Sequence, residues 1–221
     1  MPTISEMKQA AVAAIEERKE EIIGIAKTIL DNPETGFTEQ KTSRLVQEKM
    51  TAMGIPFESG LALTGVKGSV EGKAGPGPSV AVIGELDSLR VLEHPHHDEV
   101  TGAAHACGHH CQVGSMLGAM TGLLVPEVIN NLSGRIVPLA VPAEEFIEVE
   151  RRMKLRDEGK IEFMGGKQEF IKLGVFDDVD MAMISHTVAE DNKLVIGGTS
   201  NGHVVKFVQF TGRGAHAGGA P

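Results

Sequence analysis

Three short apolar runs, separated by helical segments, limit the fold more than any other feature of this sequence. The runs cover residues 79–86, 135–141 and 179–185, and each has the length of a buried strand. In the intervening stretches, helical patterns are expected over residues 108–125, 146–158 and 167–173. Strands that alternate with helices predict an α/β fold, with a layered sheet covered by helices on both faces.

The first 70 residues predict two helices and a pair of short strands. Thr3 and Glu6 form a capping box, and apolar residues at helical spacing predict one helix that continues to Pro33. A second helix is expected to be capped by Thr38 or a neighbour and to end at Gly54. The strands are expected near residues 56–61 and 65–70.

The pattern changes after residue 197. A glycine-rich joint over residues 197–202 precedes a segment whose apolar residues predict a strand: Val205, Phe207, Val208 and Phe210. We therefore expect an α/β domain over residues 1–197 and the start of a second domain over residues 198–221. One strand cannot close a domain, so we expect a fragment or a chain that needs more sequence to fold fully.

The net charge and the cysteine content limit which binding partners and which cellular compartment are expected. The chain has 221 residues, with 21 Lys and Arg against 30 Asp and Glu, and a formal net charge of −9. An acidic surface repels phosphate groups, so nucleic acid and anionic membranes are not expected as partners. Two cysteines form no disulfide framework, the N-terminus lacks a signal-peptide pattern, and no apolar stretch is long enough to span a bilayer. We expect a cytoplasmic protein.

Metal-binding residue types follow the predicted strands. Asp87 follows the first run, Glu144 and Glu145 follow the second, and His186 follows the third. Six histidines and both cysteines lie between positions 94 and 111. Ligands of open α/β sheets bind outside the carboxyl ends of the strands, so these residues are expected to converge. A donor set of Cys, His and Glu suits zinc, and also manganese or cobalt.

Simpler interpretations apply to part of this cluster. A His-rich surface loop is usually solvated, so His94, His96 and His97 are expected to have no direct role. A structural zinc site would need four closed ligands at a spacing such as CxxC, which Cys107 and Cys111 fit poorly. Two adjacent carboxylates at the end of an apolar strand are costly unless a metal ion or a proton neutralises them.

Several motifs together resemble a known family. They are Gly102-Ala-Ala-His-Ala-Cys-Gly-His109, Pro142-Ala-Glu-Glu145, the strand-end His186 and Gly214-Ala-His216-Ala. The sequence resembles the dinuclear metal amidohydrolases of metallopeptidase family 20. Within that family it is most similar to the branch of hippurate hydrolases, indole-acetyl-amino-acid hydrolases and aminobenzoyl-glutamate hydrolases. The likeness runs from about Thr38 to the end of the chain.

The resemblance implies a role for each residue. Cys107 would be shared by two divalent metal ions, His109 would be a terminal ligand, and Glu145 and His186 would complete this part of the site. Glu144 would be the general base, and Asp87 would orient the metal centre without binding it. His216 would reach an active site from a smaller lid domain and polarise the scissile carbonyl. A further His ligand of the family lies beyond residue 221.

The sequence departs from the family pattern in three places. His110 replaces the usual Asp or Asn, and Glu85 occupies the first acidic or His ligand position before Asp87. After Pro142-Ala-Glu-Glu145, a longer charged segment that begins at Phe146 replaces a glycine-rich stretch. The basic run of that segment is flanked by acidic residues and is expected to be a salt-bridged, solvent-exposed helix face: Arg151, Arg152, Lys154 and Arg156.

The function expected from these observations is metal-dependent hydrolysis of the amide bond in N-acyl amino acids or small peptides. The resemblance also implies a zinc-exopeptidase-like catalytic domain, an α+β lid that is cut after its first strand, and a homodimer at full length. The alternative is a family member without turnover that acts as a metal-binding or assembly protein. Because the distal ligand and most of the lid are missing, the 221-residue chain is expected to be inactive alone.

Overall fold

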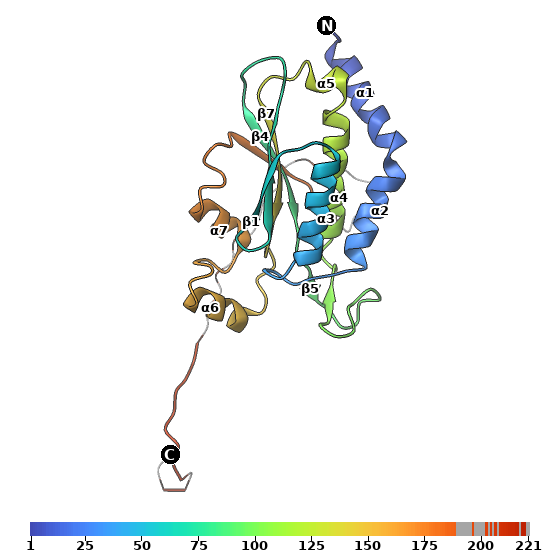
Figure 1. Cartoon of the computed structure of the whole chain (residues 1–221). Helices are drawn as coiled ribbons and strands as arrows, with labels where there is room; N and C mark the ends of the chain where they lie inside the picture. The colour runs from blue at the N-terminus through green and yellow to red at the C-terminus, as the bar shows by residue number, and fades with distance from the viewer. Residues whose placement is uncertain are drawn as a thin grey trace. The chain divides into compact units, whose positions relative to one another are not determined.

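The computed structural model describes residues 1–188 and, after them, residues 196, 202, 204, 206, 208–216 and 218–219. The chain divides into two units, Met1–Val188 and Ala189–Pro221. Each is described by itself, and all helices and strands below lie in the first unit (Figure 1).

In the first unit, three helices and six strands come first along the chain, and pairs of helices then alternate with single strands. Its helices are α1 (Ile4–Glu17), α2 (Lys19–Leu30), α3 (Gln40–Ala52), α4 (His109–Leu123), α5 (Pro126–Ile129), α6 (Val149–Asp157) and α7 (Gly166–Lys172). Its strands are β1 (Phe57–Leu61), β2 (Gly65–Gly68), β3 (Val70–Glu71), β4 (Ser79–Glu85), β5 (Leu89–Arg90), β6 (Ala103–Ala104), β7 (Arg135–Val141) and β8 (Met181–Ile184).

One mixed sheet runs through the unit in the order β1-β2-β7-β4-β8, with β3 also paired to β7. The three strands predicted from the apolar runs, β4, β7 and β8, are parallel neighbours, whereas β1, β2 and β3 pair antiparallel. In the register of β4 and β7, Glu85 lies opposite Val141. The strands therefore end at one level, and the residues that follow them meet at one edge of the sheet.

Side chains from the two faces of the sheet form two separate cores. On β7, Ile136 and Ala140 join the core beneath α2, α3 and α4. Val137, Leu139 and Val141 point to the opposite face and pack with residues that include Phe170 of α7. Figure 1 shows α1 to α5 on one side of the sheet and α7 on the other. The predicted layered α/β fold with helices on both faces is confirmed.

Helix α4 carries a stripe of glycines where α1 and α2 cross it. A Cβ atom at Gly114 would lie 3.1 Å from the side chain of Ala26, and one at Gly118 would lie 3.2 Å from Ile22. At Gly122 it would lie 2.9 Å from the carbonyl oxygen of Ala11. The small residues of this segment predicted close packing, and α1 and α2 are the elements that approach.

One detail of the N-terminal prediction is wrong. The single long helix is divided at Arg18, whose backbone leaves the helical conformation, and both resulting helices pack against α4. The N-cap of α3 is Glu39, the neighbour of Thr38, which agrees with the prediction, although its side chain makes no capping hydrogen bond. The carboxylate of Glu34 instead accepts hydrogen bonds from the backbone N–H groups of Lys41 and Thr42. The capping box of Thr3 and Glu6 is confirmed.

The prediction of a fully exposed basic face on α6 is also wrong, because Arg152 has no exposed surface. Its guanidinium donates hydrogen bonds to the backbone carbonyl oxygens of Met164 and Glu145. A charged side chain can be buried where its N–H groups find such acceptors. Arg151 and Arg156 remain partly exposed and form ion pairs with acidic neighbours.

The predicted strand near residue 205 is only partly described. Val205 and Phe207 lie outside the described residues, and Val208 and Phe210 are not paired in a sheet. The domain boundary after residue 197 stays a prediction.

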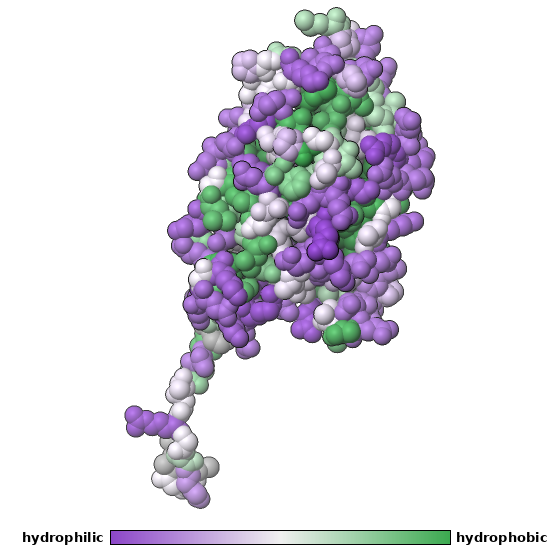
Figure 2. All heavy atoms as spheres, in the orientation of Figure 1, coloured by the Kyte–Doolittle hydropathy of each residue, from purple (hydrophilic) through white to green (hydrophobic). Residues whose placement is uncertain are grey.

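The face of the first unit in Figure 2 is mostly hydrophilic, with apolar patches between the helices. None of the helices formed by the described residues is both long and apolar enough to cross a membrane.

Close packing at the glycine stripe of α4 can be tested by one substitution, with a glycine of α2 as the control. Gly122→Ala should lower the free energy of unfolding by about 1–3 kcal/mol, because the added methyl group meets the backbone of α1. Gly24→Ala in α2 should instead raise it by up to about 1 kcal/mol, because no atom lies within 4 Å of the new Cβ and alanine favours the helix. Denaturant unfolding measures both. Equal effects of the two substitutions would contradict close packing at Gly122.

Candidate metal centre

The candidate site lies at the carboxyl edge of the three parallel strands. Asp87 follows β4, Glu144 and Glu145 follow β7, and His186 follows β8. Cys107 ends the loop before α4, and His109 is the first residue of that helix. The sheet thus brings together residues that are far apart in the sequence.

Cys107, His109 and His186 each point one potential ligand atom at the others, and these three atoms lie within 4.8 Å of one another. Cys107 Sγ lies 3.3 Å from His186 Nε2. His109 Nε2 lies 4.0 Å from Glu145 Oε1 and 3.9 Å from Glu144 Oε2. The structure therefore brings together the four predicted ligands and the predicted base.

Both histidines are held in the same manner. Nδ1 of His109 lies 2.9 Å from the carbonyl oxygen of Asp87, and Nδ1 of His186 lies 2.8 Å from that of Thr187. A carbonyl oxygen only accepts, so Nδ1 carries the proton in each ring. Nε2 of each ring faces the cluster. Metal-binding histidines are fixed in this way by a partner on the other nitrogen.

Two buried atoms of the cluster lack a hydrogen-bond partner among the described residues: His109 Nε2 and Glu145 Oε1. His109 Nε2 lies 3.0 Å from Glu85 Oε2, but the pair is not aligned for a hydrogen bond. Unpaired buried donors and acceptors are costly in a folded protein. Their presence, in a set of Cys, His and Glu, fits a site for divalent ions such as zinc.

The pKa shifts of these groups indicate that the cluster holds too little positive charge to balance its acidic side chains. Burial raises the pKa of the Cys107 thiol to about 12, and Glu145, Glu144 and Glu85 act in the same direction. Burial also raises the pKa of Glu145. Burial alone would lower the pKa of His109, but the neighbouring carboxylates of Asp87 and Glu85 raise it to about 10. A divalent cation would stabilise the deprotonated forms of all three ligands.

Asp87 lies where it can orient the centre. Its side chain is fully buried, and its two carboxylate oxygens accept hydrogen bonds from the backbone N–H groups of Glu144, at 3.0 Å, and Glu145, at 2.9 Å. Its Oδ1 is also 3.4 Å from His109 Nδ1. The position agrees with the predicted orienting role, which stays a prediction.

Sequence reasoning missed the surroundings of Glu85. Gln112 accepts a hydrogen bond from the backbone N–H of Glu85 and donates one to its carboxylate. Lys167 Nζ contacts the other carboxylate oxygen of Glu85 and lies 3.9 Å from Glu144 Oε1. Burial alone would raise the pKa of Glu85, but His109 and Lys167 lower it to about 2. Of Gln112 and Lys167, the sequence could have indicated only Gln112, because it lies one helical turn after the predicted ligand His109.

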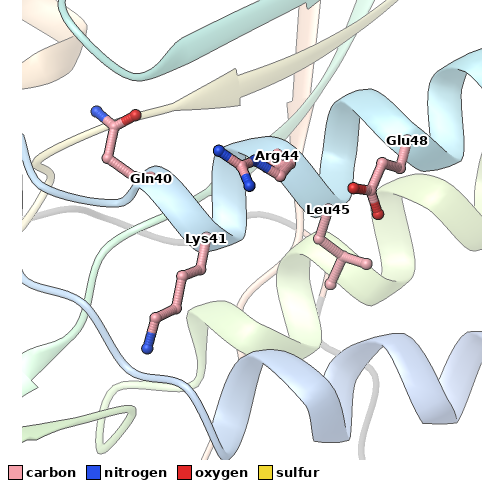
Figure 3. A pocket seen from close by; sticks show the side chains of 5 residues that line it. All are labelled: Gln40, Lys41, Arg44, Leu45 and Glu48. Atoms are coloured by element: carbon pink, nitrogen blue, oxygen red, sulfur yellow. The ribbon is translucent and has the colours of Figure 1, made fainter.

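Other predicted residues lie outside the cluster or are not placed against it. His216 belongs to the second unit, so its role stays a prediction. His96 pairs with Asp31 at 3.3 Å, with both side chains largely exposed, and the ring of His110 lies 5.5 Å from that of His105. A surface pocket beside α3 contains none of the predicted site residues (Figure 3); it is lined by Gln40, Lys41, Arg44, Leu45 and Glu48.

Known proteins resemble this chain in sequence and in fold. No family model matches the chain. The chain is 30% identical over 206 residues to the IAA-amino acid hydrolase ILR1-like 4 of Arabidopsis thaliana; this match covers 89% of this chain and 41% of the relative. It is 34% identical over 176 residues to the thermostable carboxypeptidase 2 of Saccharolobus solfataricus; this match covers 78% of this chain and 40% of the relative. The relatives that this chain matches are thus a hydrolase of amino acid conjugates and a carboxypeptidase, the kind of protein that the motifs resemble.

The chain spans about two fifths of the length of these curated relatives. Its fold matches the crystal structure of a dinuclear metal binding peptidase from the M20 family in Bacillus subtilis, with a TM-score of 0.59. That likeness covers 76% of this chain and 42% of the other, at 23% sequence identity. The resemblance stated from the motifs is confirmed by the kind of relatives found and by the fold.

Zinc binding should release protons, because coordination needs the thiolate and Cys107 is a thiol near neutral pH. Protons compete with zinc, so the apparent affinity should rise between about pH 6 and 8. Calorimetry in buffers of different ionisation enthalpy counts the protons. Cys107→Ser should weaken binding and lower the count by about one. Cys111→Ser, in the first turn of α4, should change neither quantity; equal behaviour of the two variants would remove Cys107 from the site.

Asp87→Asn should weaken zinc binding about 10- to 100-fold, because an amide offers one oxygen to two backbone N–H groups and turns a donor toward the other. Competition with a chromophoric chelator measures the affinity. Asp157→Asn at the exposed end of α6 is the matched control and should have no effect. An affinity of Asp87→Asn within about twofold of the parent would contradict the orienting role.

Proposed function

We propose that this chain carries part of the active site of a metal-dependent amidohydrolase that cleaves N-acyl amino acids or small peptides. The observation that carries the proposal is the grouping of Cys107, His109, Glu145 and His186 beside a second carboxylate, Glu144. Both rings turn Nε2 toward the group, and Glu144 is more exposed than Glu145. The names of the relatives, an amino acid conjugate hydrolase and a carboxypeptidase, support the same class of reaction.

In the proposed assignment, Cys107, His109, Glu145 and His186 hold two divalent ions, with zinc favoured by the donor set and manganese or cobalt as alternatives. Ions at such a site lower the pKa of a water molecule and make it a nucleophile near neutral pH. Asp87 would keep the ring of His109 and the backbone of the glutamate pair in place. This division leaves one carboxylate of the pair for metal and the other for proton transfer.

Glu144 would accept the proton of the attacking water and deliver it to the leaving amine. Its side chain is 37% exposed, so a substrate can reach it, whereas that of Glu145 is 15% exposed. Lys167 Nζ, 3.9 Å from Glu144 Oε1, keeps a positive charge beside the base. His216 would stabilise the negative charge on the carbonyl oxygen. A homodimer and a cytoplasmic location complete the proposal.

The proposal separates two neighbouring residues of the same type. In the protein that carries residues 1–221, Glu144→Gln should lower kcat by at least about 100-fold and leave the metal content unchanged. Glu145→Gln should instead lower the metal content, because it removes a ligand. Turnover of N-acetyl and N-benzoyl amino acids and metal analysis measure the two effects.

Two results would contradict this assignment. If Glu144→Gln loses metal, or keeps a rate within about tenfold of the parent, Glu144 is not the base. If the parent binds metal but does not hydrolyse any of these substrates, the alternative of a metal-binding or assembly protein is supported instead.

A further inference from the structure

Helix α6 begins four residues after Glu145, inside the charged segment that follows the Pro142–Glu145 motif. Its side chain Arg152 is fully buried, although the rest of the basic run is at least partly exposed. A buried guanidinium costs solvation free energy, so its contacts need to repay this cost.

Those contacts fix the guanidinium in one place. Nη1 donates a hydrogen bond to the carbonyl oxygen of Met164 at 2.6 Å, and Nη2 donates one to the carbonyl oxygen of Glu145. The guanidinium carbon lies 5.4 Å from the ring centre of Phe37 and 6.0 Å from that of Phe146, within range for cation–π contacts. A Cβ atom at Gly36 would lie 2.5 Å from Nη2, so a glycine leaves the space for this group.

The backbone that Arg152 holds is the turn that carries both glutamates. Ala143 has a positive φ of 51°, which is unfavourable for alanine. The buried carboxylate of Glu39 accepts the N–H of Ala143 at 2.8 Å, and Asp87 accepts those of Glu144 and Glu145. Carboxylates thus hold the N–H groups of the turn, and Arg152 holds the carbonyl oxygen at its end.

The charges around Arg152 match this arrangement. Burial lowers the pKa of Arg152, and the negative charges of Asp87 and Glu39 act in the opposite direction. Arg152 therefore places a positive charge near the two buried carboxylates that bind the N–H groups of the same turn. An apolar side chain could fill the space but could neither hold the carbonyl oxygen of Glu145 nor balance these charges.

We propose that Arg152 is a positioning residue that sets the direction of the Glu144 and Glu145 side chains, so that α6 is a working part of the site. The inference rests on the proposed function. Arg152 touches neither substrate nor metal, and it acts through the backbone of Glu145. Its loss should therefore impair the chemical step and metal binding more than substrate binding.

Arg152→Lys and Arg152→Ala test the proposal in the protein that carries residues 1–221, with Arg156→Ala on the same helix as the matched control. Both Arg152 variants should lower kcat and zinc affinity about 10- to 100-fold, with KM within about threefold of the parent. Guanidinium ion added to Arg152→Ala should restore part of kcat. Arg156→Ala should behave as the parent and show no rescue.

The two Arg152 variants also cover the case in which one of them does not fold. If Arg152→Ala does not fold, the lysine variant decides the matter, because it keeps the charge but lacks the two-armed donor group. Unchanged kcat and zinc affinity in folded Arg152→Lys would overturn the inference, as would lower thermal stability with normal turnover in folded Arg152→Ala. If the parent itself shows neither zinc binding nor turnover, the proposed function fails and not the role of Arg152.

Discussion

The candidate centre depends on one buried carboxylate, Asp87. Its oxygens accept the N–H groups of Glu144 and Glu145, and one of them lies beside the ring of His109. A single side chain thus links the end of β4, the end of β7 and the start of α4. The parallel pairing of β4 with β7 makes this possible, because it ends both strands at the same level. Without that register, the two glutamates and the histidine would have no common support.

Much of this could be predicted from the sequence, for a definite reason. The apolar runs before Asp87, Glu144 and His186 have the length of strands, and parallel strands that alternate with helices place their carboxyl ends together. Those two rules predict the fold class and bring residues about 100 positions apart to one edge. The motif around Cys107 and His109 added the second half of the cluster.

Other parts of the site could not be predicted, because they depend on contacts that leave no local pattern. Lys167 reaches Glu85 only because α7 packs on the face of the sheet opposite α4. Arg152 belongs to a run of alternating charges, which normally indicates a solvated helix face. Its burial depends on Phe37, Gly36 and the carbonyl oxygen of Glu145, which come from two other segments of the chain. The periodicity of apolar and charged residues describes one helix or strand at a time, so it does not predict contacts that involve several segments.

The wide spacing of the ligands has a consequence for how the protein matures. Cys107 and His186 are joined through Thr187, whose hydroxyl donates to the carbonyl oxygen of Cys107 at 3.0 Å, and this contact needs β8 to be paired with β4. An unfolded chain has to close long loops before these ligands meet, and such closure is slow. Metal capture would therefore come late in folding and would draw the equilibrium toward the folded sheet. The supply of metal in the cell would then influence the amount of folded protein, in addition to any effect on catalytic activity.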